Sequence, residues 1–426
     1  MQHSPPVQIR QRFRLTRLGL HFLFVATFTM IGGALRGFNL LLVLSGLLIG
    51  ALLIQWRASR WVIESSLVAR RLPADAFAGL RFRVHYRVRN VSRLLPVWTI
   101  RIDDRIAAVQ SDDLSSAGCG VGVVGPAETV TAHYDCVVST RGVYKFGPLQ
   151  VSTSFPFSLL LARRIVSEES VLYVYPRMLT LRKGWQQMLE TKQGGAASVA
   201  RRSGPHEGDF FGLREWQTGD NPRWIHHRTT ARVGEPIVRQ FEQQRRFDAC
   251  LLVDCYSPDA GRGSDQLVET AISFAATIVA ASNGSPANQL VIAVADTEAH
   301  TFVGGRHRGG KRRMLQLLAA ATPTKKPRLV AAIERAILAA GHAKDLVVIS
   351  PRSLHEVLET DQDDSRQLSR HLQSWMRRGG LRWINVAAAE VGDWIVDPLP
   401  THPPSKPNSD RAMAKSVVEV GDAKPA

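Results

Sequence analysis

The sequence has 426 residues, of which 45% are hydrophobic and 21% are charged. This length and composition exclude a disordered polymer and predict two or three folded units. The formal net charge is +17, but residues 1–60 contain seven arginines and no acidic residue, so +7 of it surrounds two apolar segments. The remaining +10 is spread over 366 residues and is weak support for nucleic-acid binding.

Two apolar segments follow the basic N-terminus, which comprises residues 1–17. Residues 18–35 and 38–56 contain no formally charged side chain, and only Arg36-Gly37 separates them. A helix needs about 20 residues to cross the hydrocarbon core, so the pattern predicts a hairpin of two transmembrane helices. A cleaved signal peptide fits poorly, because the second apolar run follows at once. A buried hairpin would need a domain that covers both helices.

The flanking arginines predict how this hairpin lies in a membrane. Because the turn is short, both ends of the hairpin emerge on the same side, and the turn holds only Arg36. The positive-inside rule then places both termini in the cytoplasm. The cysteines are reduced there, whereas an oxidising compartment would allow a bridge between Cys119 and Cys136. The arginines on the outer flanks are Arg10, Arg12, Arg14, Arg17, Arg57, Arg60, Arg70 and Arg71.

A β-rich part is predicted over residues 62–176. Residues 82–88 place an apolar side chain at every second position, which is typical of a strand with one buried face. Residues 98–102 and 130–138 show a similar strand-like pattern of apolar side chains. The glycine-rich stretch 117–125 is interpreted as a turn. Short strands at this spacing predict a β-sandwich of immunoglobulin-like type. A fragment that begins near Val62 is expected to fold without the hairpin.

The part from residue 247 to residue 390 alternates strands with helices. Repeated strand–helix units predict a doubly wound, mostly parallel sheet. The tail at 398–426 is rich in Pro, Lys, Ser and Asp and is predicted to be disordered. The expected strands are 248–254, 288–295, 346–350 and 381–388, and the expected helices are 267–281, 314–321, 329–340 and 365–378.

The connecting segment 177–246 contains a signature box at residues 208–242. Its pattern is Leu-Arg-Glu followed by an aromatic residue, then Gly-Asp-x-x-Arg-x-Ile-His, then Ala-Arg. This box resembles the signature of the domain-of-unknown-function 58 family, and the resemblance extends over about residues 15–390. The box residues that carry it are Arg214, Glu215, Trp216, Gly219, Asp220, Arg223, His226 and Arg232.

The resemblance implies several expectations about fold and partners. Members of this family are typically bacterial membrane proteins, so the inner membrane is the expected location and the lipid bilayer the first partner. Their α/β part resembles a von Willebrand factor A domain. Their genes lie near those of MoxR-type AAA+ ATPases, often beside a transglutaminase-like membrane protein. The family's biochemical role is largely undetermined, so the resemblance implies partners rather than a reaction.

Asp254 is the candidate metal ligand that this resemblance implies. A metal-binding von Willebrand A site has Asp-x-Ser-x-Ser after its first strand and an acid after a later strand. Here Asp254 is in place, but position 256 is Tyr, position 258 is Pro and Ser257 is out of register. The later strand ends in Ser350 instead of an acid. Mg²⁺ is therefore not expected, and Asp254 is expected to cap a helix or pair with an arginine.

The box residues allow two interpretations. In the first they build a turn, with Asp220 paired to Arg223 or Arg232. In the second, Arg214, Arg223 and Arg232 form a recognition surface for an acidic partner. His226-His227 is interpreted as part of a strand, where adjacent side chains point to opposite faces and cannot easily share a ligand.

The leading functional hypothesis is a non-enzymatic interaction protein. The sequence has no Walker A, GxSxG or HExxH motif, and no catalytic residue is predicted. We expect a membrane-tethered adaptor or assembly factor that works with a MoxR-type ATPase. One alternative is an enzyme with an unrecognised active site in the α/β part. Another is a nucleic-acid-binding membrane protein, although nucleic acid is not the expected partner.

Overall fold

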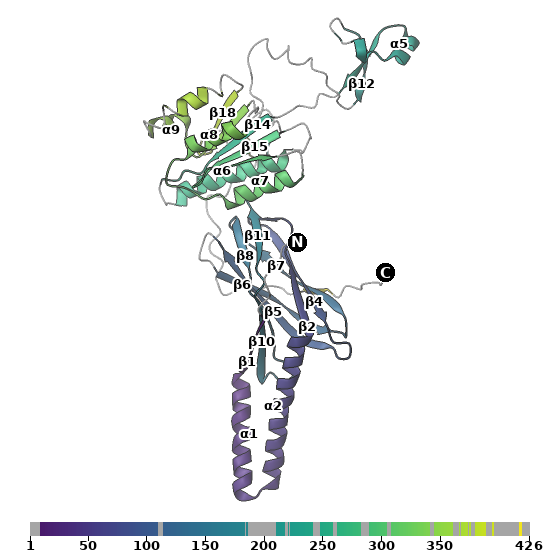
Figure 1. Ribbon diagram of the computed structural model, residues 1–426, viewed down its shortest axis with the longest axis vertical. Coiled ribbons are helices and arrows are strands. Elements are labelled where there is room, and N and C mark those ends of the chain that lie inside the picture. Colours follow the sequence, from purple (N-terminus) through teal and green to yellow (C-terminus); the bar gives the residue numbers. More distant parts are fainter. Residues whose placement is uncertain are drawn as a thin grey trace. The chain divides into compact units, whose positions relative to one another are not determined.

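The computed structural model divides the chain into two compact units, and each is described by itself (Figure 1). Unit 1 comprises residues 1–177 and 400–426, and unit 2 comprises residues 178–399. The residues that the structure describes are 9–109, 114–183, 185, 210–217, 220, 222–241, 248–258, 262–282, 289–304, 308–340, 345–360, 366, 368–373, 375, 380–388, 394–395 and 417–419.

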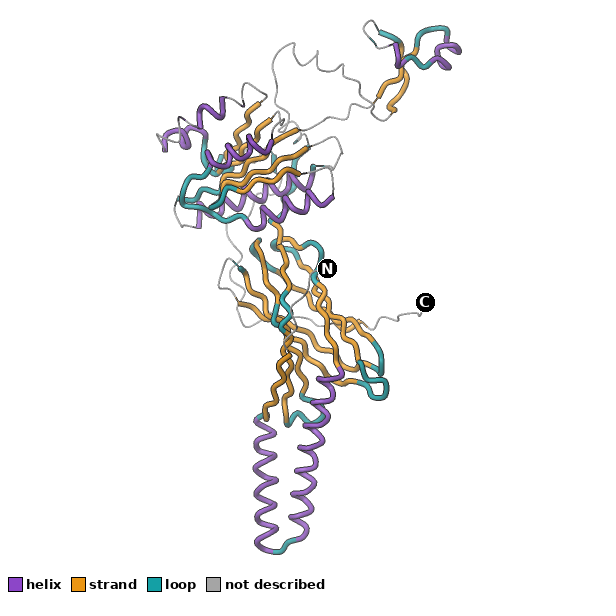
Figure 2. Tube along the Cα trace, in the orientation of Figure 1, coloured by secondary structure: helices purple, strands orange, loops and turns teal. Residues whose placement is uncertain are grey.

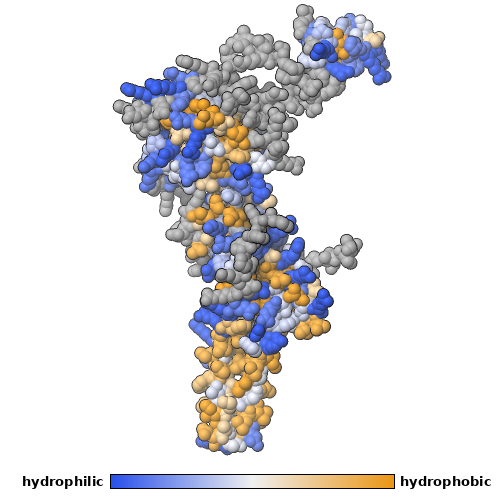
Figure 3. All heavy atoms as spheres, in the orientation of Figure 1, coloured by the Kyte–Doolittle hydropathy of each residue, from blue (hydrophilic) through white to orange (hydrophobic). Residues whose placement is uncertain are grey.

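Unit 1 begins with the helical hairpin, α1 (Arg17–Arg36) and α2 (Asn39–Ser65). The chain reverses at Gly37, whose φ of 67° is in the left-handed region that favours glycine. Both helices are long and apolar enough to cross a membrane, and only 17% and 11% of their apolar windows are buried. Figure 3 shows an almost continuous apolar surface on the hairpin. The two predicted apolar helices are confirmed, and their exposed surface suggests a membrane protein.

The second helix is longer than the predicted span. It continues for nine residues after Trp56, to Ser65. Val62 and Ile63 near its end are 0% and 1% exposed and belong to the hydrophobic core of unit 1. The following strand begins at Ser66, so the first residues of the predicted β part are helical instead. The hairpin is therefore continuous with the core of the β part.

The loop between β9 (Leu149–Thr153) and β10 (Leu160–Val166), residues 154–159, binds the start of α1 and the second half of α2. The Gln55 amide is fully buried in α2, and its Oε1 accepts the backbone N–H of Phe157 at 2.7 Å. Its Nε2 lies 3.0 Å from the carbonyl oxygen of Phe155. On the other side, the hydroxyl of Thr16, the N-cap of α1, donates to the carbonyl oxygen of Ser158 at 2.8 Å. These bonds tie the β part to both helices.

Two sheets share the hydrophobic core of unit 1. One has the order β19-β7-β4-β2, and the other has the order β1-β10-β9-β5-β8-β11-β3, with β6 beside β5 (Figure 2). Buried aromatic and aliphatic residues from both sheets, such as Tyr86 and Phe146, fill the space between them. The strands after the hairpin are β2 (Ser66–Arg71), β3 (Ala76–Phe77), β4 (Arg81–Asn90), β5 (Val97–Ala108), β6 (Leu114–Val124), β7 (Thr129–Val137), β8 (Gly142–Phe146), β9 (Leu149–Thr153), β10 (Leu160–Val166) and β11 (Ser170–Tyr175).

Three segments of unit 1 differ from the predicted structure. The basic N-terminus contains β1 (Ile9–Leu15), which pairs antiparallel with β10. The glycine-rich stretch is strand β6, so its interpretation as a turn was wrong; its alternating Cys119 and Val121 are buried against the core. In the predicted disordered tail, Val417–Glu419 forms β19 beside β7, and the other residues of that tail lie outside the described part.

Unit 2 contains a five-stranded sheet of order β16-β15-β14-β17-β18. The central strand β14 runs parallel to both neighbours, and only β16 at the edge is antiparallel within this sheet. The predicted α/β sheet is thus confirmed, and β16 is an additional strand. Its elements are β14 (Asp248–Asp254), α6 (Arg262–Ala281), β15 (Gln289–Ala295), β16 (His300–Gly304), α7 (Arg308–Ala320), α8 (Leu329–Ala340), β17 (Asp345–Ser350), α9 (Leu354–Thr360) and β18 (Gly380–Asn385).

Helices cover both faces of this sheet (Figure 1). Cys250 and Leu252 of β14 pack in a cluster with Ile333 of α8 and Leu372. Helices α6 and α7 contact each other, and α6 also contacts β14 and β17. Because side chains of β14 are buried on both faces, its sequence is a continuous apolar run instead of an alternation.

Candidate functional site

The strand order of unit 2 defines one edge where ligands commonly bind. In an open sheet of order 3-2-1-4-5, the connections diverge between the first and fourth strands, here β14 and β17. Ligands commonly occupy the crevice beyond the carboxyl ends of the strands at this point. Asp254 is the last residue of β14 and Ser350 is the last residue of β17, and both are fully buried.

An arginine pairs with the carboxylate at this edge of the sheet. The Oδ2 atom of Asp254 accepts hydrogen bonds from the Ser350 hydroxyl at 2.8 Å and from Nη2 of Arg352 at 2.9 Å. Its Oδ1 atom accepts the backbone N–H of Tyr256 at 3.2 Å. The Arg352 guanidinium also lies 4.0 Å from the centroid of the Tyr256 ring, a cation–π contact. The buried Asp254 carboxylate is thus paired with a cationic side chain.

Neighbouring groups fix the position of Arg352. Its backbone N–H donates to the Ser350 hydroxyl at 3.0 Å, and its carbonyl oxygen accepts Nε1 of Trp383 at 2.9 Å. Only 12% of the Arg352 side chain is exposed. A buried carboxylate with a buried arginine and a hydroxyl is a satisfied polar network. The expectation that Asp254 pairs with an arginine is confirmed, but the sequence did not identify which arginine, because Arg352 lies 98 residues from Asp254 along the chain.

The hydroxyl that a metal site would use is turned toward another group. Ser257 Oγ lies 2.8 Å from both Ser264 Oγ and Asp265 Oδ1, at the start of α6. A hard cation needs several oxygen ligands around one point. Among the residues that the structure describes, no group of three or more His, Cys, Asp or Glu side chains is placed to hold a metal ion. The arrangement at Asp254 therefore fits an ion pair better than Mg²⁺.

The signature box forms a small hairpin of its own. Strands β12 (Phe210–Glu215) and β13 (Ile237–Phe241) pair antiparallel, and η1 (Pro222–Trp224) and α5 (His227–Val233) lie between them. The backbone N–H of Trp216 donates to the carbonyl oxygen of Pro236 at 2.9 Å, which extends the pairing beyond the strands. Gly219 lies outside the described residues.

Arg214 and Asp220 form the central ion pair of the box. Arg214 donates Nη1 to Oδ2 of Asp220 at 2.7 Å and Nη2 to Oδ1 at 2.5 Å, a bidentate geometry. The same carboxylate accepts the backbone N–H of Gln217 at 2.9 Å. The Arg214 guanidinium holds the pKa of Asp220 below its ordinary value. Asp220 was expected to pair with Arg223 or Arg232, and this expectation of its partner is corrected by the bonds to Arg214.

The two histidines lie at the start of a helix, so their interpretation as part of a strand was wrong. His226 is the N-cap of α5, and its Nδ1 accepts the backbone N–H of Thr229 at 3.3 Å. The backbone N–H of His226 donates to the carbonyl oxygen of Ile237 in β13 at 2.7 Å. His227 is the first residue of α5 and is exposed. His226 therefore connects α5 to the box hairpin.

The remaining box residues differ in their exposure. Glu215, Arg223 and Arg232 are exposed, whereas Trp216 and Asp220 are half-buried. The structure thus divides the residues of the signature: Arg214, Asp220 and His226 hold the hairpin together, and Arg223 and Arg232 lie on its surface.

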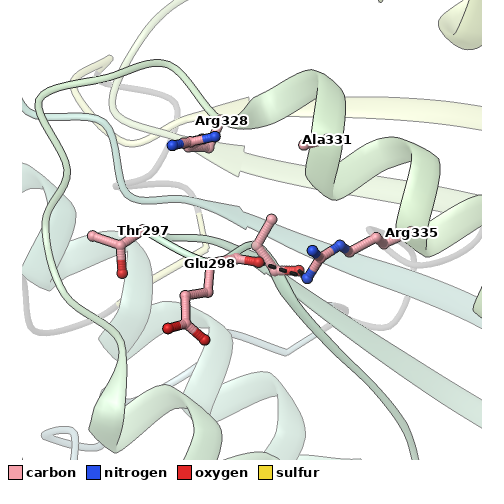
Figure 4. A pocket seen from close by; sticks show the side chains of 6 residues that line it. Thr297, Glu298, Arg328, Ala331 and Arg335 are labelled. Atoms are coloured by element: carbon pink, nitrogen blue, oxygen red, sulfur yellow. Dashed lines mark hydrogen bonds between the residues drawn. The ribbon is translucent and has the colours of Figure 1, made fainter.

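A shallow pocket elsewhere in unit 2 contains none of the predicted site residues. Its volume is about 300 Å³, and it lies between the loop after β15 and helix α8 (Figure 4). Nη1 of Arg335 donates to the backbone carbonyl oxygens of Glu298 and Ala299, at 2.6 and 2.9 Å. This arginine is therefore occupied in holding the loop. The lining residues are Thr297, Glu298, Ala299, Arg328, Ala331 and Arg335.

These features define a class of protein: an apolar helical hairpin continuous with a β unit, followed by an α/β unit that carries a small box hairpin. Residues 212–371 match the model of the family described as Protein of unknown function DUF58. This match confirms the predicted resemblance over that region.

Other comparisons give little similarity. No curated protein sequence matches the chain. Among solved structures, the chain is similar to a β-glucosidase from Listeria innocua at 15% identity and a TM-score of 0.19, over 26% of this chain and 16% of that one. It is similar to a CARDB domain from Pyrococcus furiosus at 15% identity and a TM-score of 0.16, over 24% of this chain and 85% of that one. The DNA glycosylase AlkC from Pseudomonas fluorescens gives 10% identity and a TM-score of 0.19, over 32% and 39%.

Proposed function

We propose that this chain is a membrane-anchored cytoplasmic interaction protein that works with a MoxR-type AAA+ ATPase in protein or complex assembly. The observation that carries the proposal is the ion pair at the carboxyl end of strand β14 in the α/β sheet. The edge where such sheets commonly hold ligands is occupied by the Asp254–Arg352 ion pair and the Tyr256 ring. A partner must then be bound by exposed surface, and the box hairpin provides that surface.

Membrane anchoring by the hairpin is the first part of the proposal. Hydrophobic side chains such as Phe24, Phe28 and Leu40 are more than two-thirds exposed, which is costly in water and favourable in lipid. Arginines lie on both outer flanks, and the turn carries Arg36 alone. The positive-inside rule places both units on the cytoplasmic side of a bacterial inner membrane.

Reporter fusions test this orientation. A fusion after Arg60 within α2 and a fusion after Ala426 are both expected to report the cytoplasm, because the arginines flank the outer ends of the hairpin. A fusion in the turn after Gly37 should report the opposite compartment and serves as the matched control. A periplasmic signal from either of the first two fusions would contradict the proposed orientation.

The α/β unit is proposed to be a von Willebrand A-like domain whose cation site is replaced by an ion pair. The support is the strand order with a central parallel strand that ends in Asp254, together with the family resemblance. The Arg352 guanidinium neutralises this carboxylate at 2.9 Å without a metal. Binding of a partner through a metal-bridged acid is therefore not part of the proposal.

The box hairpin is proposed to contact the partner through its exposed arginines. Arg223 in η1 and Arg232 in α5 lie on one short segment that the bidentate Arg214–Asp220 pair holds at its base. Exposed arginines on a preorganised segment recognise carboxylates well, because the guanidinium fork matches carboxylate geometry. The partner surface is accordingly expected to be acidic.

Charge reversal on the box is expected to weaken ATPase binding. The full chain in nanodiscs should bind the purified MoxR-type ATPase of the same genome saturably in the presence of ATP. The double substitution Arg223→Glu/Arg232→Glu should weaken the affinity about tenfold or more, because like charges then face each other across the interface. Surface plasmon resonance at two salt concentrations measures both the affinity and its electrostatic part.

Matched variants separate this effect from misfolding and from net charge. The control variant Arg87→Glu/Lys145→Glu replaces two exposed basic residues of unit 1 and changes the net charge by the same amount as the box variant. It should leave the affinity for the ATPase unchanged. Thermal melting of both variants beside the wild type measures any effect on the fold, so that a loss of affinity is assigned to the interface only where the melting temperature is unchanged. Equal weakening by both double variants would show a nonspecific charge effect, and no binding by the wild type would contradict the proposed partner.

A further inference from the structure

The loop between β4 and β5 lies at the end of unit 1 where the membrane hairpin joins. Strand β4 runs antiparallel to β2, so its last residue, Asn90, pairs with Ser66, the residue that follows α2. The next backbone N–H, of Val91, donates to the carbonyl oxygen of Ser65 at 2.9 Å. Figure 1 shows β2 continuing from α2, with β4 beside it. Residues 91–95 therefore extend from the sheet back toward the apolar part of α2; we call them the rim loop.

Side-chain hydrogen bonds hold the rim loop in one conformation. Asn90 Nδ2 donates to the carbonyl oxygens of Leu95 and Gly125, at 2.9 and 3.0 Å, and so ties the loop to the turn after β6. Its Oδ1 accepts the backbone N–H of Ser92 at 2.9 Å. The Ser92 hydroxyl in turn accepts the backbone N–H groups of Leu94 and Leu95. The loop is thus preorganised.

This preorganised loop displays apolar side chains to the outside. Leu94 is 87% exposed and Leu95 is 52% exposed. Val91 on the same loop and Val123 near the end of β6 are also exposed. A single exposed leucine is ordinary, but a group of exposed apolar residues held together by a hydrogen-bonded turn marks an interaction surface.

The charges around the rim loop are mainly positive. Arg89 and Arg93 are both exposed. Two neighbouring acids already have partners: the Glu128 carboxylate accepts the backbone N–H of Gly125 at 2.6 Å, and Glu64 pairs with Arg60 at 2.8 Å. Apolar side chains with arginines beside them match the interface of a membrane that contains anionic lipids.

The height of the rim loop above the membrane follows from the length of α2. The apolar run ends at Trp56, nine residues before Ser65, which at 1.5 Å per residue is about 14 Å along the helix. The rim loop points back from Ser65 toward the membrane, which shortens this distance. The headgroup layer extends roughly 5–8 Å outward from each side of the hydrocarbon core and shortens it further. Phe157, 52% exposed, lies even closer, since its N–H binds Gln55 beside Trp56.

We propose that the rim loop is a second membrane contact: Leu94 and Leu95 enter the headgroup layer, and Arg89 and Arg93 bind anionic lipid headgroups. The contact rests on the proposed function, since it requires that the hairpin span the membrane. It fixes the tilt of the β unit on the bilayer, because one rigid body then touches the membrane through both the hairpin and the loop. The content of anionic lipid in the membrane thereby influences the tilt of the β unit.

Site-specific fluorescence on the full chain in nanodiscs tests this contact. Single cysteines replace Phe28 in α1, Leu94 in the rim loop or Leu80, and each is labelled with the polarity-sensitive dye NBD. Leu80 is the matched control, because it is also an exposed leucine but precedes β4, about 30 Å from Asn90 along the strand.

The native thiols interfere little with this labelling. Cys119, Cys250 and Cys255 are buried, and Cys136 is replaced by serine in every variant. Burial raises the pKa of both the Cys119 and Cys250 thiols to about 12, so they are not ionised at neutral pH.

The expected result is quenching of the dye at positions 28 and 94 by lipids brominated in the acyl chains near the headgroup, with no quenching at position 80. The quenching at position 94 should be stronger with phosphatidylglycerol than with phosphatidylcholine alone, and Arg89→Glu/Arg93→Glu should abolish the difference. Quenching at 28 but not at 94 would overturn this inference and leave the anchor intact. No quenching at 28 would overturn both, and equal quenching at 94 and 80 would overturn the specific role of the loop.

Discussion

A fragment that begins at Val62 is expected to lose the cooperative fold of the β unit, although the sequence alone predicted that such a fragment folds. This truncation removes β1, Thr16 and the buried Gln55. It also reduces α2 to a single turn, which does not hold its helical conformation without the preceding residues. The β unit and the hairpin therefore share one folding unit.

The magnitude of this loss is set by the helix end. Val62 and Ile63 are almost fully buried, and unpacking both side chains costs about 3–6 kcal/mol. The hydrogen bonds of Gln55 and Ser59 to the loop 154–159 add about 1 kcal/mol each. Since a folded domain is stable by only about 5–15 kcal/mol, the sum is comparable to the whole stability.

A bridged variant provides the control. Residues 20–52 are replaced by a short Gly-Ser linker, which is long enough because packed helices lie only about 8–10 Å apart. This variant of residues 1–177 keeps β1, Thr16 and the end of α2, and it should be soluble and melt cooperatively. Circular dichroism and size-exclusion chromatography compare it with 62–177. A cooperative transition of equal midpoint in both fragments would show that the hairpin is dispensable for folding.

Removal of Arg352 is expected to destabilise unit 2 by about 3–5 kcal/mol. Arg352→Ala leaves the fully buried Asp254 carboxylate without its cationic partner, and an uncompensated buried charge is costly. Arg352→Lys keeps the charge but loses the forked geometry and the broad stacking on Tyr256, so its loss should be smaller. Urea unfolding of the full chain in detergent, followed by circular dichroism and total tryptophan fluorescence, measures both losses.

Two further variants of the same pair sharpen this test. Asp254→Asn/Arg352→Met removes both charges and should cost less than Arg352→Ala alone, which isolates the unpaired charge as the cause. Millimolar Mg²⁺ or Mn²⁺ against chelator should leave the wild-type melting temperature unchanged, because the guanidinium already neutralises Asp254. A reproducible metal-dependent shift that disappears in Asp254→Ala would contradict this description of the site.

The sequence predicted the strands and helices whose own residues show a clear pattern of apolar side chains. Strand β14 was predicted with its observed bounds, 248–254, because it is a continuous apolar run between polar residues. Helix α8 was also predicted with its observed bounds, 329–340, since its apolar residues recur at helical spacing. In contrast, β1 was missed because its arginines were attributed entirely to membrane orientation, although Phe13 and Leu15 alternate with them.

The candidate site depends on contacts that no local pattern contains. Asp254 was recognised from the end of its strand, but its partner Arg352 follows a different strand that is adjacent only through the strand order. In the box, Asp220 was assigned to nearby arginines downstream, whereas the strand β12 brings Arg214 to it from upstream. To predict which charged side chains pair between elements, one must know the order and register of the strands. Composition and spacing do not determine these.

The pairing of β1 with β10 has a consequence for the order of events during synthesis. Arg12 pairs with Arg163, so 151 residues separate the two strands along the chain. At a synthesis rate of 5–20 residues per second, β1 waits roughly 8–30 s for its partner. The hairpin that follows β1 emerges during this interval and can enter the bilayer first. The arginines on β1 discourage its pairing with other chains in the meantime, and the sheet closes only after both helices of the hairpin have been synthesised.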